Sequence, residues 1–314
     1  PKSWMVNETK WNEMNLGDYP KTYNELFEKI EMWLNEYAAD YPEYTLADVQ
    51  QMGLNTLVLS MVEAYIHENE ASGMQLTFDT PSFREMMKCV SDNAYLLSEE
   101  NEQWGMPLLT SMYLGFGTCY TDSDLNRMIL PPALDLNGKQ SLYAEMSILA
   151  VNAASKNAEV ATRFVEFCAE NLSNTVRYEM EPELNEPVES SAYYVRVAEL
   201  QGKINDLAEQ LEKADQDARY AIKEKIIQAE AKLEQLEERK WEIDPKSIEI
   251  YRSAAENLKV SYKSPLLLKG ENGGYEALRS VVDKYCTQDF SDSDINALIA
   301  ELDRVATMVY LESL

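Results

Sequence analysis

Residues 192–242 are the most regular segment of the chain, because their apolar side chains recur at alternating steps of four and three. That spacing is the seam of a coiled coil. The first seam consists of Leu200, Ile204, Leu207, Leu211, Ala214 and Ala218. The second seam consists of Ile222, Ile226, Ala229, Leu233 and Leu236, and it is out of phase with the first by one residue. This period predicts long helices rather than strands.

The two seams change phase within a polar stretch, residues 214–217, where Asp217 is placed to cap a new helix. We therefore predict an antiparallel coiled-coil hairpin of two helices, each roughly 30 Å long. One continuous helix is the alternative interpretation, because neither glycine nor proline interrupts the stretch.

Capping residues mark helix starts elsewhere, each followed by an acidic side chain three positions later or by proline in the first turn. These signals are Thr22 with Glu25, Thr45 with Asp48, Thr80 with Pro81, and Ser291 with Asp294. Residues 156–172 have the spacing of an amphipathic helix. Residues 74–79 and short apolar runs between 107 and 154 predict strands. The alternation predicts a helix-rich α/β fold with a small sheet.

The formal net charge of −27 narrows the classes of partner. A surface this acidic repels phosphate backbones and anionic lipid headgroups, so we expect no nucleic-acid partner and no peripheral membrane binding. No stretch reaches the roughly 18–20 apolar residues of a membrane span. The longest apolar candidate, residues 54–65, contains Ser60 and Glu63 and predicts a buried helix. This acidic charge balance fits a soluble protein that binds neutral solutes.

Residues for covalent chemistry are scarce. His67 is the only histidine, which argues against His-based triads and most zinc sites. The sequence has no phosphate-binding glycine loop or GxSxG elbow, and no carboxylate pair stands out as a glycosidase pair. Acidic clusters at residues 122–126 and 289–294 lack the spacing of an EF-hand, and helix-start chemistry explains the second. We therefore predict neither an enzyme nor a cofactor or metal site.

The four cysteines, Cys89, Cys119, Cys168 and Cys286, are far apart in the sequence and form no CxxC motif. Three of them fall in amphipathic helical patterns, which favours buried free thiols. One or two disulfides are the alternative.

Four aromatic residues in the glycine-containing strand and loop region are candidate ligand-binding residues: Trp104, Tyr113, Phe116 and Tyr120. Flat aromatic rings beside carboxylates and amides suit sugars, because sugars present apolar CH faces. Packing in the core is the alternative role for each of these rings.

Three segments resemble extracellular solute-binding proteins (family 1 type) of bacterial carbohydrate ABC importers. Asn7–Leu26, NETKWNEMNLGDYPKTYNEL, is similar to the family's short helix and Gly followed by Pro-x-Thr-x-x-Glu-Leu. Ser147–Phe167, SILAVNAASKNAEVATRFVEF, is similar to its strand, Ala-Ser-Lys-Asn turn and helix. Leu302–Ser313, LDRVATMVYLES, resembles its C-terminal helix. The order and spacing fit as well, and the second segment is the most specific.

The resemblance implies a periplasmic-binding-protein-like fold of type II, in which two lobes close on a ligand. Residues 1–151 would be a C-terminal-lobe-like α/β part, and residues 152–259 would belong to the N-terminal lobe. The coiled coil, residues 192–242, would be an insertion in that second part, and residues 260–314 would return to the C-terminal lobe as helices. Much of the N-terminal lobe, a signal peptide and a lipid-anchor cysteine would precede residue 1.

The function implied by the resemblance is the capture of a small solute, expected to be a carbohydrate, outside the cell or in the periplasm. Delivery to ABC permease subunits would follow hinge closure, and the membrane would be contacted only through the lipid anchor. A structural or protein-interaction module that acts through the coiled-coil hairpin is the alternative function.

Overall fold

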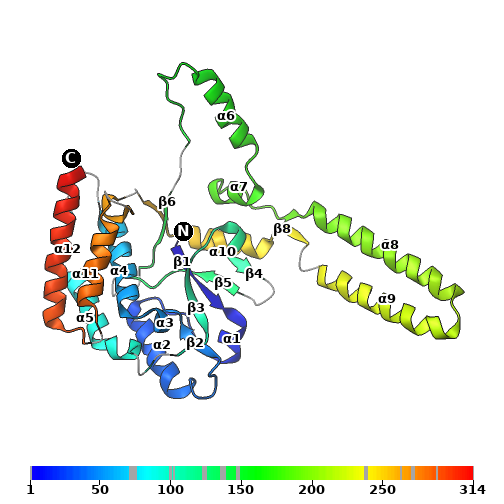
Figure 1. Cartoon of the computed structure of the whole chain (residues 1–314), viewed down its shortest axis with the longest axis horizontal. Coiled ribbons are helices and arrows are strands. Elements are labelled where there is room, and N and C mark those ends of the chain that lie inside the picture. The colour runs from blue at the N-terminus through cyan, green and yellow to red at the C-terminus, as the bar shows by residue number, and fades with distance from the viewer. Residues whose placement is uncertain are drawn as a thin grey trace. The chain divides into compact units, whose positions relative to one another are not determined.

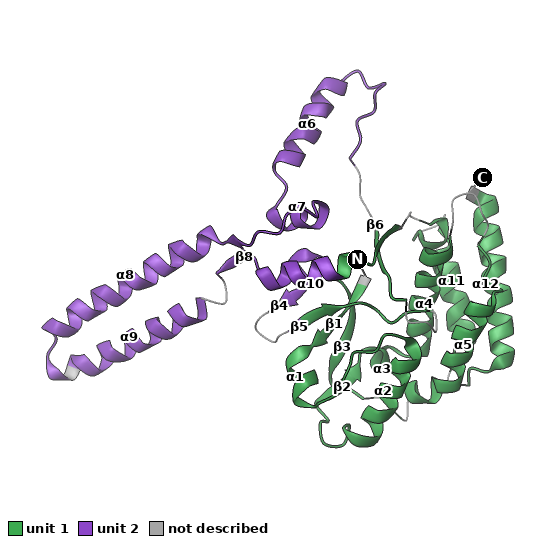
Figure 2. Ribbon diagram, turned by 180° about the vertical axis from the view of Figure 1, so that it is seen from behind, with its two compact units in different colours: residues 1–114, 127–148, 254–314 green, residues 115–126, 149–253 purple. Residues whose placement is uncertain are grey.

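The computed structural model describes residues 2–70, 76–98, 101, 103–121, 126–134, 139–145, 149–236, 240–261, 264–269, 273–287 and 289–313. The chain divides into two compact units, drawn in Figures 1 and 2. Unit 1 consists of residues 1–114, 127–148 and 254–314, and unit 2 consists of residues 115–126 and 149–253. The chain therefore passes between the units four times. Residues 115–126 belong to unit 2, a passage that the sequence patterns did not predict.

Unit 1 combines a mixed sheet with helices. Its strands are β1 (Lys2–Asn7), β2 (Tyr44–Ala47), β3 (Met106–Tyr113), β5 (Asn126–Ile129), β6 (Leu142–Glu145) and β9 (Leu258–Ser261). Its α-helices are α1 (Glu8–Glu13), α2 (Tyr23–Glu36), α3 (Val49–Met52), α4 (Leu54–Asn69), α5 (Pro81–Asn93), α11 (Tyr275–Tyr285) and α12 (Asp292–Ser313). Two 3-10 turns, η1 (Ala94–Leu97) and η5 (Pro265–Leu267), also belong to this unit. The predicted helix-rich α/β class is confirmed.

The sheet joins strands from all three chain segments of unit 1. β1 pairs with β3 in antiparallel register, with Trp4 opposite Ser111 and Val6 opposite Leu109. β2 pairs with β3 in parallel, so that Ala47 also lies opposite Leu109. β6 pairs in parallel with β9 and touches β1 at one position. Because β9 follows unit 2 in the sequence, the sheet cannot be completed by the first segment alone.

Helix α4 places one apolar face in the core of unit 1. Its buried side chains are Leu54, Leu57, Val58, Met61, Val62, Tyr65 and Ile66. α11 packs against α4, and α12 packs against α11 and α5, as the ribbon in Figure 1 also shows. Leu298 and Leu302 of α12 are completely buried in this cluster. Each such side chain contributes about 1.5–3 kcal/mol relative to exposure to water. The predicted buried helix at residues 54–65 is confirmed.

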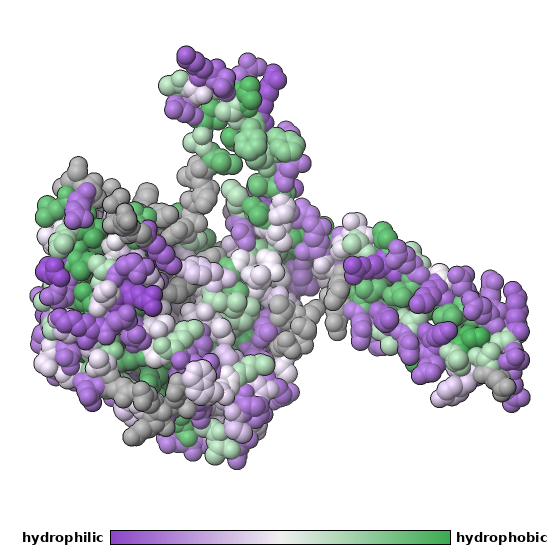
Figure 3. Space-filling model, viewed as in Figure 1, coloured by the Kyte–Doolittle hydropathy of each residue, from purple (hydrophilic) through white to green (hydrophobic). Residues whose placement is uncertain are grey.

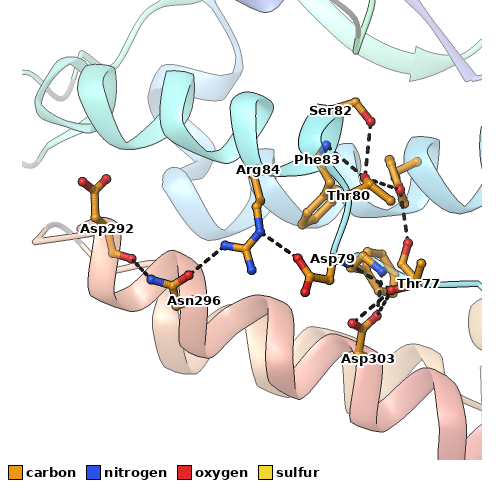
Figure 4. A network of polar contacts seen from close by, with 11 residues as sticks. Thr77, Asp79, Thr80, Ser82, Phe83, Arg84, Asp292, Asn296 and Asp303 are labelled. Carbon is orange, nitrogen blue, oxygen red and sulfur yellow. Dashed lines mark hydrogen bonds and ion pairs between the residues drawn. The ribbon is translucent and has the colours of Figure 1, made fainter.

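A polar network joins the loop before α5 to α12 (Figure 4). The Asp303 carboxylate accepts a hydrogen bond from the Phe78 backbone N–H at 2.6 Å and two contacts from the Thr77 hydroxyl at 3.1 Å. Arg84 of α5 donates to the Asn296 side-chain oxygen of α12 at 2.7 Å. Since Phe78 is fully buried, Asp303 satisfies a backbone donor that would otherwise lack a partner in an apolar setting.

Unit 2 is mostly helical. Its α-helices are α6 (Ala158–Glu170), α7 (Asn174–Met180), α8 (Ser191–Lys213), α9 (Gln216–Leu236) and α10 (Pro245–Ala255). Its short strands are β4 (Tyr120–Thr121), β7 (Val188–Glu189) and β8 (Trp241–Ile243), and η3 is a 3-10 turn at Phe116–Thr118. β7 and β8 pair in antiparallel register at the base of α8 and α9. The division between the units falls within the sequence of α10, whose last two residues, 254 and 255, belong to unit 1.

The segment with the two apolar seams, residues 192–242, forms two helices, α8 and α9, and not one continuous helix. They pack along each other as a hairpin in both ribbon views, and Leu207 and Ala229 from the two seams are buried. The cap of α9 is Asp215, whose carboxylate accepts from the Ala218 backbone N–H at 2.9 Å. The expected cap, Asp217, therefore lies too late in the sequence, because the break comes directly after Lys213.

Apolar side chains of unit 2 are widely exposed. In the space-filling view of Figure 3, they form green patches on α6, whose label is in Figure 1. On this helix Val160 is 69% exposed, Phe164 60% and Phe167 61%, and no residue of α6 is buried. The predicted amphipathic helix is confirmed, but its apolar face is not covered by the described residues. The core of unit 2 is correspondingly small.

The capping predictions hold at three places and fail at one. Thr22, Thr80 and Ser291 each stand before a helix as predicted. Thr45, however, lies in strand β2, and α4 begins only after Gly53, whose φ of 80° ends the short helix α3. The Asp48 carboxylate accepts from the Ser111 backbone N–H at 2.7 Å instead of closing a capping box. Pairing of β2 with β3 therefore overrides the local signal.

Two of the predicted strands also differ from the structure. The described part of the predicted strand at 74–79, residues 76–79, is not extended into a sheet, although Leu76 and Phe78 are both buried as expected for one face. Among the short apolar runs between 107 and 154 that predict strands, the run at 146–151 falls partly outside the described residues, and residues 149–151 form no strand. The neighbouring segment forms β6 instead, because it pairs with β9.

All four cysteines are free thiols, and Cys119 and Cys286 are buried. Burial raises the pKa of Cys119 to about 11 and that of Cys286 to about 12. We expect both thiols to resist iodoacetamide in the folded protein, because the thiolate is the reacting form. Cys168 on exposed α6 should be modified first. Mass spectrometry of peptides after timed alkylation checks this order, and equal rates at all four positions would contradict it.

These raised thiol pKa values also make folding depend on pH. The folded state keeps its thiol protons above the ordinary pKa of 9.0, whereas the unfolded state loses them. The contribution of both groups to stability is therefore fully present below pH 9 and is lost as pH rises towards 11 and 12.

Candidate functional site

A cavity of about 390 Å³ lies within unit 1. Its wall is formed by α3 and α4, by residues of β1, β3 and β6, and by the loop at residues 131–134. The Gln140 side chain holds this loop by donating to the Pro131 carbonyl at 3.0 Å. The Ala133 backbone N–H donates to the Lys21 carbonyl at 2.7 Å, which anchors the loop beside the start of α2.

Four aromatic side chains line the cavity: Trp4, Tyr23, Tyr113 and Tyr143. Trp4 and Tyr23 are buried, whereas Tyr113 is 77% exposed and lies at the end of β3. The Tyr143 ring stacks on the His67 ring with centroids 5.3 Å apart and an angle of 17° between the planes. The cavity therefore has fixed aromatic surfaces inside and one accessible ring.

Helix α4 contributes a stripe of polar side chains to the cavity wall. Thr56, Ser60, Glu63 and His67 follow one another at steps of four, three and four, so they share the helix face opposite the buried one. Glu68 lies beside this stripe and also lines the cavity. The stripe brings two hydroxyls, a carboxylate and an imidazole to the wall, and Glu68 adds a second carboxylate.

The charge of Glu68 acts on two phenols of the wall. Burial, followed by the carboxylates of Glu68 and Asp48, raises the pKa of Tyr23. Burial, followed by the neighbouring Glu68, also raises the pKa of Tyr143. The Tyr143 hydroxyl is buried and has no hydrogen-bond partner of regular geometry among the described residues. Both phenols therefore stay protonated at neutral pH and offer hydroxyl groups rather than charges.

Buried polar residues hold helix α3, which forms part of the cavity wall. The Asp48 carboxylate accepts from the backbone of Ser111, which lines the cavity, and Val49 and Met52 follow Asp48 into the wall. The Gln50 side-chain oxygen accepts from the Ala47 backbone N–H at 3.1 Å. These contacts fix α3 against β2 and β3 and so hold Val49 and Met52 in the cavity wall.

Of the four aromatic residues singled out from the sequence, Tyr113 alone lines the cavity. Trp104 is 75% exposed elsewhere on unit 1. Phe116 is buried in unit 2, where its ring packs on Tyr178 and Tyr251. Tyr120 is also in unit 2, and the Lys246 ammonium lies 4.5 Å from the centroid of its ring. The structure therefore does not bring the four together in one unit.

Sequence reasoning missed most of the wall, including Trp4, Tyr23, Tyr143 and Glu68. These residues come from separate segments, so no local pattern joins them. The polar stripe on α4 was the one signal available, since it interrupts the apolar stretch at Ser60 and Glu63.

The described residues contain no group of three or more side chains suited to hold a metal ion. Residues 122–125 of the first acidic cluster lie outside the described residues. In the second cluster Asp294 caps α12 by accepting from the Ser291 backbone N–H at 3.0 Å. No described helix has the length and apolar character needed to cross a bilayer.

Comparisons of this chain with protein-family models, with curated proteins and with solved structures find no match.

Proposed function

We propose that unit 1 binds a small carbohydrate in the cavity beside α4. The supporting observation is the composition of the wall, which combines aromatic rings with carboxylates and hydroxyls. Sugar CH faces pack on aromatic rings, and sugar hydroxyls donate to carboxylates and exchange hydrogen bonds with hydroxyl groups. A volume of about 390 Å³ lies within the usual range for small-ligand sites.

The physiological role that we propose is solute capture outside the cell for delivery to an ABC importer permease, without covalent chemistry. The carbohydrate-importer resemblance of residues 7–26, 147–167 and 302–313 supports it. The four chain passages between the units supply the connections that a hinge needs, and Tyr113 lies just before the first of them. We include in this proposal a type II binding-protein fold, a lipid anchor in the full-length protein and a coiled-coil insertion at residues 192–242.

Exchange of Tyr113 for alanine tests the binding proposal. We expect Tyr113→Ala to weaken neutral trisaccharide binding by about fivefold to tenfold, since an aromatic contact contributes about 1–1.4 kcal/mol. Trp104→Ala is the matched control, because Trp104 is similarly exposed but does not line the cavity. Titration calorimetry and the fluorescence of Trp4 report binding. Failure of every neutral or charged sugar to bind the intact protein, or equal loss in both variants, would contradict the proposal.

A protein-interaction module that acts through the hairpin is the second candidate function. The observation that favours it is a pair of apolar side chains on α9, Tyr220 and Ile227, which are 78% and 64% exposed. They are seven residues apart and so lie on one helix face. Such a face suits contact with another protein.

Removal of the hairpin separates the two functions. The Ser190 backbone N–H donates to the Lys240 carbonyl at 2.8 Å, so the ends of the hairpin meet. A short Gly-rich turn can therefore replace residues 191–239. We expect this variant to bind sugar with unchanged affinity, because the cavity belongs entirely to unit 1. Loss of a partner complex in pull-down, together with an absence of sugar binding in either protein, would favour the interaction module.

A further inference from the structure

Glu68 carries a charge that unit 1 leaves unbalanced. The residue is half-buried on the cavity wall, and it forms no ion pair with a lysine or arginine in the described part of the chain. Removing a carboxylate from water without a cationic partner is unfavourable. A cationic group in the cavity would offset that cost, so the free protein is arranged for a ligand that supplies one.

The other charged groups of the cavity wall also favour a cationic ligand over an anionic one. Glu63 adds a second carboxylate, and no lysine or arginine is among the described lining residues. Lys259 is a described cation close to this region, but its ammonium lies 5.7 Å from the centroid of the Tyr143 ring and does not line the cavity. An anionic ligand would therefore meet two carboxylates and no cation among the described residues of the wall.

The aromatic wall is compatible with a bound cation. Burial, followed by the Glu68 carboxylate, raises the pKa of Tyr23 and of Tyr143, so both phenols are neutral beside that carboxylate. The exposed ring of Tyr113 offers a face to an ammonium group or to the sugar ring next to it. The formal net charge of −27 also attracts cations over longer distances and repels anions.

We propose that the ligand of this cavity is an amino sugar with a protonated amine, whose ammonium group binds at the Glu68 carboxylate. This inference rests on the proposed carbohydrate function and adds a charge to the ligand. A hydrogen bond between two charged groups is stronger than one between neutral groups, so the amine becomes the main determinant of selectivity.

The test is calorimetric titration of the intact protein with the trisaccharide of glucosamine, with its fully N-acetylated counterpart and with spermidine. We expect the free-amine trisaccharide to bind about 10- to 100-fold more tightly than the acetylated one, the range for a hydrogen bond to a charged group. Higher salt should reduce the preference, because it screens the pair. Equal affinity of the two trisaccharides would overturn the inference and leave the carbohydrate function standing.

Two variants assign the effect to one carboxylate. Glu68→Gln should remove the preference, so that the free-amine and the acetylated trisaccharide bind with the same affinity. Glu85→Gln changes net charge equally at an exposed position of α5 outside the cavity and should leave the preference intact. A preference retained in Glu68→Gln would overturn the inference. Spermidine binding without any sugar binding, or no binding at all, would overturn the inference and the carbohydrate function together.

Discussion

Gly105→Ala is expected to lower the free energy of unfolding of unit 1 by about 3 kcal/mol, at the upper end of overpacking effects. A Cβ atom at this position would come within 2.6–2.8 Å of the Tyr44 backbone. Backbone atoms of Tyr44 cannot move aside, because β2 is held in parallel register with β3 and Met106 donates to the Glu43 carbonyl at 2.8 Å. The new methyl group would therefore separate the two strands.

Urea unfolding followed by tryptophan fluorescence measures this effect, since four of the five tryptophans, Trp4, Trp11, Trp33 and Trp104, belong to unit 1. Gly202→Ala in α8 is the matched control, because nothing lies within 4 Å of the position that its Cβ would take. Alanine there should stabilise the helix by about 0.5–1 kcal/mol and leave the fluorescence transition unchanged. A transition in Gly105→Ala equal to that of the wild type would refute the close approach of the two strands.

Asp303→Ala should cost about 2–3 kcal/mol, because it leaves the Phe78 backbone N–H without its acceptor. The change also removes the Thr77 contacts, so the loop before α5 would lose its attachment to α12. The loss should speed hydrogen exchange at the Phe78 amide and at the first turn of α5. Tyr65 holds the same loop from α4 by donating to the Thr77 carbonyl at 3.1 Å, so the loop should loosen without releasing the core.

Asp303→Asn distinguishes the role of the acceptor from the role of the charge. The asparagine side-chain oxygen can still accept from the Phe78 N–H, so we expect less than half the cost of Asp303→Ala. Denaturation midpoints and amide exchange rates of both variants measure the difference. Equal costs for the two would mean that the charge of Asp303, and not its geometry as an acceptor, stabilises the loop.

Elements set by neighbouring residues could be predicted from the sequence. The starts of α2, α5 and α12 follow from cap residues that act within three positions, and the buried face of α4 follows from its own spacing. Thr45 and Asp48 have the same local pattern, which predicts a helix start at Thr45, but Thr45 lies in β2 and Asp48 stands before the short helix α3. Their contacts with β3 join residues about 60 positions apart, and no local pattern reveals such pairing.

The candidate site was predictable only at its edge. Tyr113 was among the candidate residues because its segment alternates short apolar runs with glycine, and it lies at the cavity. Phe116 has the same kind of sequence environment but packs into the core of unit 2. An aromatic side chain can line a cavity or fill a core, and which of the two it does depends on the segments that pack around it in the folded protein. Trp4, Tyr23 and Tyr143 meet only after the sheet and the loop at 131–134 have formed.

The division of unit 1 into three stretches of sequence sets the order of events during synthesis. A ribosome must translate all of unit 2 before β9, α11 and α12 emerge, so residues 1–148 wait without the helices that cover α4 and α5. Until then, the apolar faces of those two helices are open to other nascent chains or to chaperones. Productive folding of unit 1 therefore depends on the arrival of its last 61 residues (254–314), whereas the α8–α9 hairpin, whose contacts are local, can form while translation continues.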